Sequence, residues 1–288
     1  MTFIQLIASG LLIGGVYALL AGGITLIFGV LKVVNFAHGD FMMVGMFLTF
    51  FLNQGLGLSP YVALPIVAIV MFAFGALIHY GLIQWTINSG HTRQIVLTLG
   101  IGIVLQSLAL VLFGGNFRSA TMSDSFTGAI SLGPINLGMT RVIAFVIAIV
   151  VTVALLVFLD KTLIGKAIRA TAMDGYAAQL MGIPVKRIYL ITMGVGAALA
   201  GIAAAVLLPI YPVFPTIGMT MMTIAFVVVV LGGLGSVVGA LIGGLIVGVV
   251  ESVSGYFVGA ALSQVIVLAL FGVILVVLPR GIMKGEAA

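Results

Sequence analysis

The sequence predicts an all-α fold, a polytopic bundle of eight to ten transmembrane helices with a short additional helix on the cytoplasmic side. Of 288 residues, 63% are hydrophobic and only 6% are charged, whereas a water-soluble globule carries about 25% charged residues. Apolar segments of about 20 residues, the length that crosses a bilayer, recur along nearly the whole chain. Residues 1–288 are therefore expected to form a single transmembrane domain, and any nucleotide chemistry must come from another chain.

The charge distribution argues against a nucleic-acid partner and in favour of membrane lipid. The formal net charge is +5, but the basic residues are scattered between apolar segments, whereas a nucleic-acid site gathers them in one patch. The absence of cysteine excludes disulfides, thiolate metal sites and cysteine nucleophiles, and no metal site is expected. The apolar N-terminus has no basic region before it, so it is expected to be a retained span and not a cleaved signal peptide.

The predicted spans follow the apolar runs, and one region is ambiguous. A shorter apolar piece at 40–52 follows the polar interruption Asn35–Asp40, so this region could be two spans or one broken helix. The other spans are expected at roughly 5–31, 60–84, 94–114, 142–159, 188–209, 217–234, 237–256 and 262–279.

Lysine and arginine in short loops predict the orientation, because such loops stay on the cytoplasmic side. The segment Asp160–Arg187 is the most basic and is placed inside. The His91–Arg93 loop and a C-terminal tail with Arg280 and Lys284 then lie inside as well, and the long segment Gly115–Arg141 lies outside. The N-terminus is outside if there are nine spans and inside if there are eight or ten.

The basic segment contains the start and stop signals of a short helix. Asp174 can cap the first turn with its carboxylate, Gly182 suits the left-handed position after the last turn with Ile183 as its apolar partner, and Pro184 prevents continuation. About two turns of helix are too short to span. The apolar surface of this helix needs cover, either as an interfacial helix on lipid headgroups or as a docking knob for a cytoplasmic protein.

Polar residues at membrane depth are candidate functional residues, because they are costly there. Asn35, His38 and Asp40 could line a translocation path and bind a zwitterion at a helix break; alternatively, Asn35 or Asp40 caps a helix and backbone groups satisfy His38. Thr98 and Gln106 lie eight residues apart, on one face of a helix, and are expected to point to the interior.

Glu251 is expected near the outer end of its span. It could meet substrate or a binding protein there, or it could simply reach water between the headgroups. Small residues four positions apart let helices approach closely. Glycines have this spacing at Gly235, Gly239 and Gly243, and again at Gly244 and Gly248. They predict either a gate or ordinary packing within the bundle.

Several separated motifs resemble one family, the LivH/LivM-type permeases of branched-chain amino acid ABC transporters. The first is the loop Gly165–Ala170, followed by Asp174, Ala177, Leu180, Met181-Gly182-Ile183 and Arg187, which resembles the coupling loop of that family. The other matching segments, closest to the LivH branch, are Gly14–Leu19, Leu26–Val30, Val34–Gly39, Gly232–Ser236 with Gly239-Ala240, and Pro279-Arg280-Gly281. The resemblance covers essentially the whole chain.

The resemblance implies a heteromeric importer of the bacterial inner membrane. The expected partners are a second permease, two ATP-binding subunits and a periplasmic substrate-binding protein. ATP and Mg would bind to the ATPases, and this chain would bind no cofactor and catalyse no reaction, which agrees with the absence of a G-x-x-x-x-G-K-[ST] phosphate loop from the sequence. The expected substrates are amino acids, above all branched-chain and other hydrophobic ones.

Within the segment 161–187, the resemblance assigns the coupling role to a set of residues that would contact the ATPase. They are Arg169, Asp174, Ala177, Leu180, Met181, Gly182, Ile183 and Arg187.

Three other classes compete with the importer. An ion-coupled secondary transporter of small organic solutes would also be a helical bundle, but it has no use for an ATPase-docking loop. An intramembrane enzyme needs a converging nucleophile and base or paired carboxylates, and the histidines and aspartates are isolated along this chain. A channel of the potassium type would need a TVGYG-like filter, which the sequence lacks.

Overall fold

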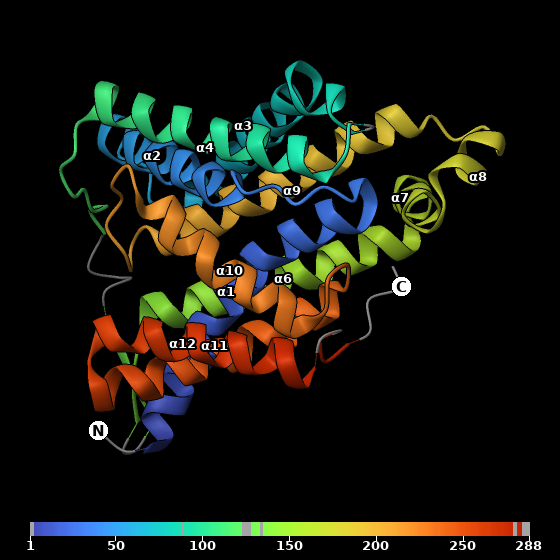
Figure 1. The fold of residues 1–288 in the computed structure, drawn as a ribbon. Helices are drawn as coiled ribbons and strands as arrows, with labels where there is room; N and C mark the ends of the chain where they lie inside the picture. Colours follow the sequence, from blue (N-terminus) through green and yellow to red (C-terminus); the bar gives the residue numbers. More distant parts are fainter. Residues whose placement is uncertain (1–2, 88, 123–127, 133–134, 279–280, 284–288) are drawn as a thin grey trace.

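The computed structural model describes residues 3–87, 89–122, 128–132, 135–278 and 281–283, and within them it is a bundle of helices (Figure 1). The predicted polytopic helical bundle is confirmed. Its elements are α1 (Phe3–Leu31), α2 (His38–Leu56), α3 (Pro60–Gly81), η1 (Ile83–Trp85), α4 (His91–Phe113), β1 (Ala129–Leu132), β2 (Ile135–Gly138), α6 (Met139–Lys161), α7 (Leu163–Met173), α8 (Gly175–Leu180), α9 (Val185–Leu207), α10 (Ile217–Gly232), α11 (Val237–Val258) and α12 (Ala260–Val277).

Six helices are long and apolar enough to cross a membrane: α1, α3 extended by η1, α4, α6, α9 and α11. Two shorter apolar helices, α10 and α12, coincide with the remaining predicted spans, and the ambiguous piece at 40–52 is α2. The structure thus decides between the two readings of this region. The helix α1 is continuous, and α2 is a separate helix that follows a non-helical segment at residues 32–37.

The central helix α1 is mostly buried, and it packs antiparallel to α11 through glycines. A Cβ atom added to Gly14 would lie 2.5 Å from the carbonyl oxygen of Gly244, and one added to Gly10 would lie 2.6 Å from the Cα of Val249. Gly248 faces the backbone of the same part of α1. Ordinary bundle packing therefore explains Gly244 and Gly248.

The helices α2 and α10 both begin in the middle of the bundle. The imidazole of His38 packs where α1 and α9 cross, beside Gly23 and Gly196, and Gly196 is the midpoint of α9. One residue later, Gly39 packs on the carbonyl of Gly218 in the first turn of α10. From this level the two helices run to opposite ends of the bundle.

The expectation that 217–234 forms a full span is therefore wrong. The helix α10 has 16 residues, and at 1.5 Å per residue it is about 24 Å long, shorter than a hydrocarbon core of about 30 Å. The chain between α9 and α10 completes the crossing in non-helical form. Such a backbone is tolerated at depth only when protein encloses it.

The two ends of the bundle differ in charge and in secondary structure (Figure 1). We call the end with α7, α8 and the turn at 82–90 the basic face. The described basic residues at this face are Lys32, Arg93, Lys161, Lys166, Arg169, Lys186 and Arg187. We call the opposite end, with the strands β1 and β2, the hairpin face. The predicted positions Arg280 and Lys284 lie outside the described residues.

The N-terminus lies at the hairpin face, where Gln5 Nε2 donates a 3.1 Å hydrogen bond to the carbonyl of Asn136. If the basic face is cytoplasmic, the N-terminus is therefore outside, and only an odd number of crossings of the bundle is compatible with the described chain.

The segment 115–141, which the charge pattern places outside, contains regular structure and contacts to other parts of the chain. The strands β1 and β2 pair antiparallel, with Ala129 opposite Gly138. Arg118 forms a backbone bridge with Val213 in the α9–α10 connection, and Asn53 accepts from the backbone N–H of Thr121 at 3.0 Å. This two-stranded hairpin leaves the predicted all-α fold class unchanged. Asp124 and Pro134 of this segment lie outside the described residues.

Candidate functional site

The non-helical segment 32–37 returns from the basic face to the middle of the bundle, and several of its polar groups have partners there. Asn35 Oδ1 accepts from the backbone N–H of Ala37 at 3.1 Å, and the N–H of His38 donates to the carbonyl of Asn35 at 3.2 Å. Thr98 Oγ1 on α4 lies 3.4 Å from the carbonyl of Val34. These contacts replace the hydrogen bonds that a helix would provide, so the break is tolerated at membrane depth.

Three helices converge on the carboxylate of Asp40, which is 4% exposed. On α4, Gln106 Nε2 donates a 2.8 Å hydrogen bond to Asp40 Oδ1, and a Cβ atom added to Gly102 would lie 2.5 Å from Oδ2. Gly218 in the first turn of α10 packs against Oδ1 and the backbone of Asp40. Because helix N-termini favour negative charge, the first turns of α2 and α10 both stabilise a carboxylate here.

Two neighbouring side chains have unused hydrogen-bonding groups. Asn35 Nδ2 and both ring nitrogens of His38 are buried and make no hydrogen bond of normal geometry among the described residues, although the backbone of Leu20 approaches the imidazole. An unsatisfied buried polar group costs about 1–3 kcal/mol. A polar substrate in transit could use these groups.

The structure places the five predicted site residues in the segment 35–40 and on α4, and we call them the midplane cluster: Asn35, His38, Asp40, Thr98 and Gln106. The His38 imidazole lies beside Gly23 of α1, whereas the Asp40 carboxylate faces α4 and α10. The capping alternative fits only in part, because Ala37 occupies the N-cap position of α2 and no side chain caps that position. Gly102 and Gly218 could not be predicted from the sequence as neighbours of the carboxylate. A single glycine in an apolar helix gives no signal of what packs against it.

Glu251 lies apart from this cluster, on α11, with its Oε2 atom buried and without a hydrogen bond. Its carboxylate is close to Tyr17 of α1, and the Tyr17 hydroxyl lies 3.4 Å from that of Tyr211. The expectation that Glu251 reaches water between headgroups is therefore wrong for this oxygen. The two tyrosines, which the sequence analysis missed, form with Glu251 a second polar group nearer the hairpin face.

The short predicted helix is present as α8, with the expected start and stop. Asp174 Oδ1 accepts from the backbone N–H groups of Tyr176 at 2.8 Å and Ala177 at 3.0 Å. Gly182 has a φ of +84°, and its N–H donates to the carbonyl of Gln179 at 3.0 Å.

The N–H of Ile183 donates to the carbonyl of Ala178 at 3.1 Å. This pair of bonds is the Schellman motif that ends helices.

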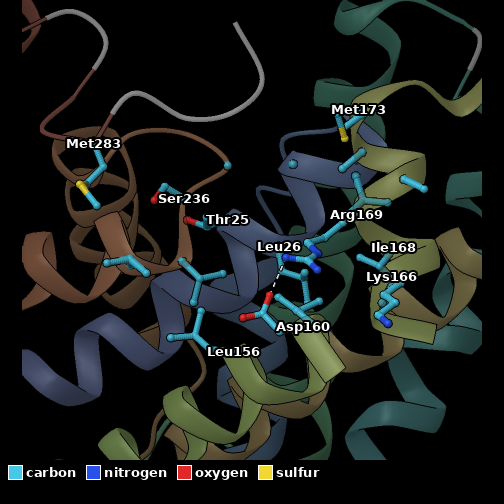
Figure 2. Close-up of a pocket in the computed structure, with 18 residues that line it drawn as sticks. Thr25, Leu26, Leu156, Asp160, Lys166, Ile168, Arg169, Met173, Ser236 and Met283 are labelled. Carbon is cyan, nitrogen blue, oxygen red and sulfur yellow. Dashed lines mark hydrogen bonds and ion pairs between the residues drawn. The ribbon is translucent and has the colours of Figure 1, made fainter. Parts of the chain in front are cut away.

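A second helix, α7, precedes α8 and was not expected. The hydroxyl of Thr162 accepts from the N–H of Gly165 at 2.9 Å and so caps its first turn. Arg169 on α7 makes a 2.5 Å ion pair with Asp160 at the end of α6 (Figure 2). Arg169, one of the residues assigned to coupling, therefore forms its ion pair within this chain.

The basic face presents an apolar surface around α8. Its large side chains are 71–83% exposed: Met173, Tyr176, Leu180 and Met181. Asp174, Ala177, Gly182 and Arg187 are also exposed, and Ile183 is partly buried. Figure 1 shows α8 projecting from the end of the bundle. Contiguous exposed apolar side chains of this kind mark interaction sites.

Comparisons with known proteins identify the family. Residues 6–278 match the model of the family described as branched-chain amino acid transport system / permease component. The chain is 30% identical over 296 residues to the high-affinity branched-chain amino acid transport system permease protein LivH of Salmonella typhimurium, covering 98% of this chain and 95% of that protein. It is also 30% identical over 293 residues to the permease protein BraD of Pseudomonas aeruginosa, with the same coverage.

A solved structure shares the overall fold. PsaBC from Streptococcus pneumoniae in complex with Fab superposes with a TM-score of 0.51 at 17% identity, over 97% of this chain and 93% of that one. The family match spans nearly all of the bundle, including the midplane cluster and the α7–α8 segment. The chain therefore belongs to the permease components of branched-chain amino acid transport systems.

Proposed function

We propose that this chain is one of the two membrane-spanning permease subunits of a binding-protein-dependent ABC importer in a bacterial inner membrane. A second permease of similar fold, two ATPase subunits and a periplasmic substrate-binding protein complete the assembly. The observation that carries the proposal is α8, an exposed apolar helix with defined caps at the basic face. An apolar helix held at the end of a membrane bundle requires a partner surface.

The side chains around α8 dock in a groove of an ATPase, and ATP and Mg bind on that subunit. Movement of α8 reaches the spanning helices through direct contacts. Asp174 is at once the C-cap residue of α7 and the N-cap residue of α8. Gly165 of α7 packs on the backbone of Leu159 in α6, and the Asp160–Arg169 ion pair joins the same two helices. Closure of the ATPases therefore displaces α6 together with α7.

The midplane cluster is the proposed contact point for substrate inside the bilayer. An amino acid carries an ammonium and a carboxylate, and the cluster offers a group for each. The ammonium approaches the Asp40 carboxylate, and the carboxylate approaches the unpaired Asn35 Nδ2. In the state described here Gln106 holds Asp40, so substrate entry exchanges that bond for one to the ligand. The protein alternates between two states whose populations ATP shifts.

Hydrophobic amino acids, above all branched-chain ones, are the proposed substrates. Two facts support this choice. The relatives LivH and BraD are named as branched-chain amino acid permeases. The groups around the midplane cluster are otherwise apolar, with Phe41, Met42 and Met222 buried next to it, and such a lining accepts an aliphatic side chain. Glu251 and the two tyrosines beside it lie on the side from which a periplasmic binding protein would deliver substrate.

Reconstitution of the complete complex tests the proposal. The tagged chain is co-purified with the ATPases and permease encoded beside its gene, placed in liposomes, and supplied with the binding protein outside and ATP inside. Leucine uptake that needs both ATP and the binding protein is the expected result. Uptake driven by an ion gradient, by a chain that purifies without ATPases, contradicts it. A binding-protein variant that does not bind leucine is the matched control for delivery.

A further inference from the structure

A pocket of about 770 Å³ opens at the basic face between four elements. Its floor is the end of α1, and its walls are α6, α7 and the turn between α10 and α11 (Figure 2). The pocket is separate from the midplane cluster, none of whose residues lines it. Neither the docking role of α8 nor the proposed substrate route uses this space.

The charges in the pocket favour an anionic ligand. Lys166 and Arg169, one turn apart on α7, line it together with Asp160, so the lining carries a net charge of +1. Arg169 already pairs with Asp160 at 2.5 Å. Lys166 has no ion-pair partner within the described part of the chain, and Figure 2 shows its ammonium extended away from the pair. Because Asp160 is already paired with Arg169, a ligand that carries an ammonium group would find no free carboxylate in the pocket. An anionic ligand would find the free ammonium group of Lys166.

Apolar side chains form the part of the lining that lies deeper in the bundle. Leu26 and Val30 of α1 and Leu156 and Leu159 of α6 form this wall. The spanning helix α6 ends at Lys161, so Asp160 and the charged part of α7 stand at the level where the hydrocarbon gives way to headgroups. The pocket therefore changes from charged to apolar in the same direction as a phospholipid does.

One polar group in the wall is unexplained by the fold. Thr25 lines the pocket, is fully buried, and its hydroxyl has no hydrogen-bond partner among the described residues. The nearby hydroxyl of Ser236 is used, because it accepts from the N–H of Gly239 at 3.0 Å and caps α11. The Thr25 oxygen exposes less than 1 Å² of surface, so it is not counted among the groups that meet a ligand in the pocket.

We propose that this pocket binds an anionic phospholipid of the inner leaflet. Its phosphate lies beside Arg169, the flexible Lys166 side chain turns toward it, and its acyl chains cover Leu26, Val30 and Leu156. Basic pockets between transmembrane helices on the cytoplasmic side are suited to such headgroups. A lipid in this position bridges α1, α6 and α7, and so it fixes α7 against the bundle while α8 moves.

Lipid retention by the intact complex tests the proposal directly. The wild-type complex and a Lys166→Gln variant are purified in mild detergent, exposed to equimolar phosphatidylglycerol and phosphatidylcholine, and analysed by native mass spectrometry. We expect wild-type protein to retain phosphatidylglycerol preferentially and the variant to lose that preference several-fold. Lys186→Gln removes the same charge from the same face but outside the pocket, and it should retain the lipid as wild type does.

A further measurement separates the lipid from other anions. Hydrogen exchange across Leu163–Met173 should slow in phosphatidylglycerol for the wild-type protein and stay unchanged for Lys166→Gln. Equal retention by wild type and Lys166→Gln overturns the proposal, as does displacement of the lipid by millimolar phosphate or leucine. None of these readouts requires transport, so they stand or fall independently of the proposed importer.

Discussion

Gln106 of α4 donates a 2.8 Å hydrogen bond to the carboxylate of Asp40 at the start of α2. This bond joins two helices that are distant in the sequence, at the level where α10 also begins. It provides the hydrogen-bond donor that a carboxylate needs inside a protein, and it places a negative charge beside two helix N-termini.

Gln106→Leu should destabilise the permease and reduce uptake. The substitution leaves Asp40 buried without its side-chain donor, which costs about 1–3 kcal/mol. Thermal unfolding of the purified complex and leucine uptake in liposomes measure the two effects. Ser107→Ala, at the next position of α4 but exposed at the surface of the chain, is the control and should match the wild type. Wild-type behaviour of Gln106→Leu would mean that the bond has no role.

Asp40→Asn should abolish uptake while leaving assembly intact. The amide keeps the shape and can still bond with Gln106, so folding is preserved, but the charge that would attract an ammonium group is gone. Uptake and the recovery of ATPases on the tagged chain are measured together. Full uptake by this variant would remove Asp40 from the substrate route without affecting the assignment of α8.

Gly182→Val should uncouple ATP hydrolysis from uptake without preventing membrane insertion. Gly182 has a φ of +84°, and a side chain in the left-handed region costs about 1–2 kcal/mol, more for a β-branched residue. The end of α8 should therefore lose its Schellman motif. The measured quantity is ATP hydrolysed per leucine transported, which should rise. Gly182→Asn tolerates this backbone and should remain close to wild type; normal coupling in Gly182→Val contradicts the prediction.

Leu180→Glu should release the ATPases. Leu180 is 71% exposed at the end of α8, and a carboxylate placed there cannot enter an apolar groove without a large desolvation cost. Co-purification of ATPase subunits with the tagged chain should fall strongly. Leu56→Glu makes the same change at an equally exposed leucine, 67% exposed, at the end of α2 near the hairpin face, and it should retain the ATPases. Retention by both variants would place the docking surface elsewhere.

Gly244→Val should disrupt the contact between α1 and α11. A Cβ atom at this position would lie 2.6 Å from the carbonyl oxygen of Gly14, and backbone cannot yield as a flexible side chain can. Overpacking typically costs about 1–3 kcal/mol. Size-exclusion chromatography after heating in detergent should show earlier loss of the folded protein. Gly100→Val on α4, where nothing lies within 4 Å of the added Cβ, should be neutral.

Features that depend on neighbouring residues could be predicted from the sequence. The cap at Asp174 and the left-handed Gly182 are local, and the structure confirms both ends of α8. The spacing of Thr98 and Gln106 placed them on one face of α4, as the shared cluster requires. Their partners could not be predicted, because Asp40 and Val34 approach them only through tertiary packing.

The depth in the bundle at which a helix begins also could not be predicted from the sequence. The segment 217–234 is apolar throughout and reads as a full span, yet α10 begins beside Asp40 because the α9–α10 connection folds back into the bundle. The same holds for Glu251. Its apolar neighbours gave no sign that Tyr17 and Tyr211, far away in the chain, surround its carboxylate. The helix α7 was missed although Thr162 caps it, because its basic residues were interpreted as orientation markers.

The single residue shared by α7 and α8 has a consequence for the timing of transport. Asp174 ends one helix and caps the next, so there is no spare linker in which a displacement could be taken up. The two helices are therefore joined directly at Asp174. When α8 is displaced, α7 must move at once, and only the angle between the two helices can change. An insertion of two or three glycines after Met173 would create a flexible linker between α7 and α8. Part of the displacement of α8 would then be lost in the linker, and ATP would be hydrolysed before the spanning helices moved.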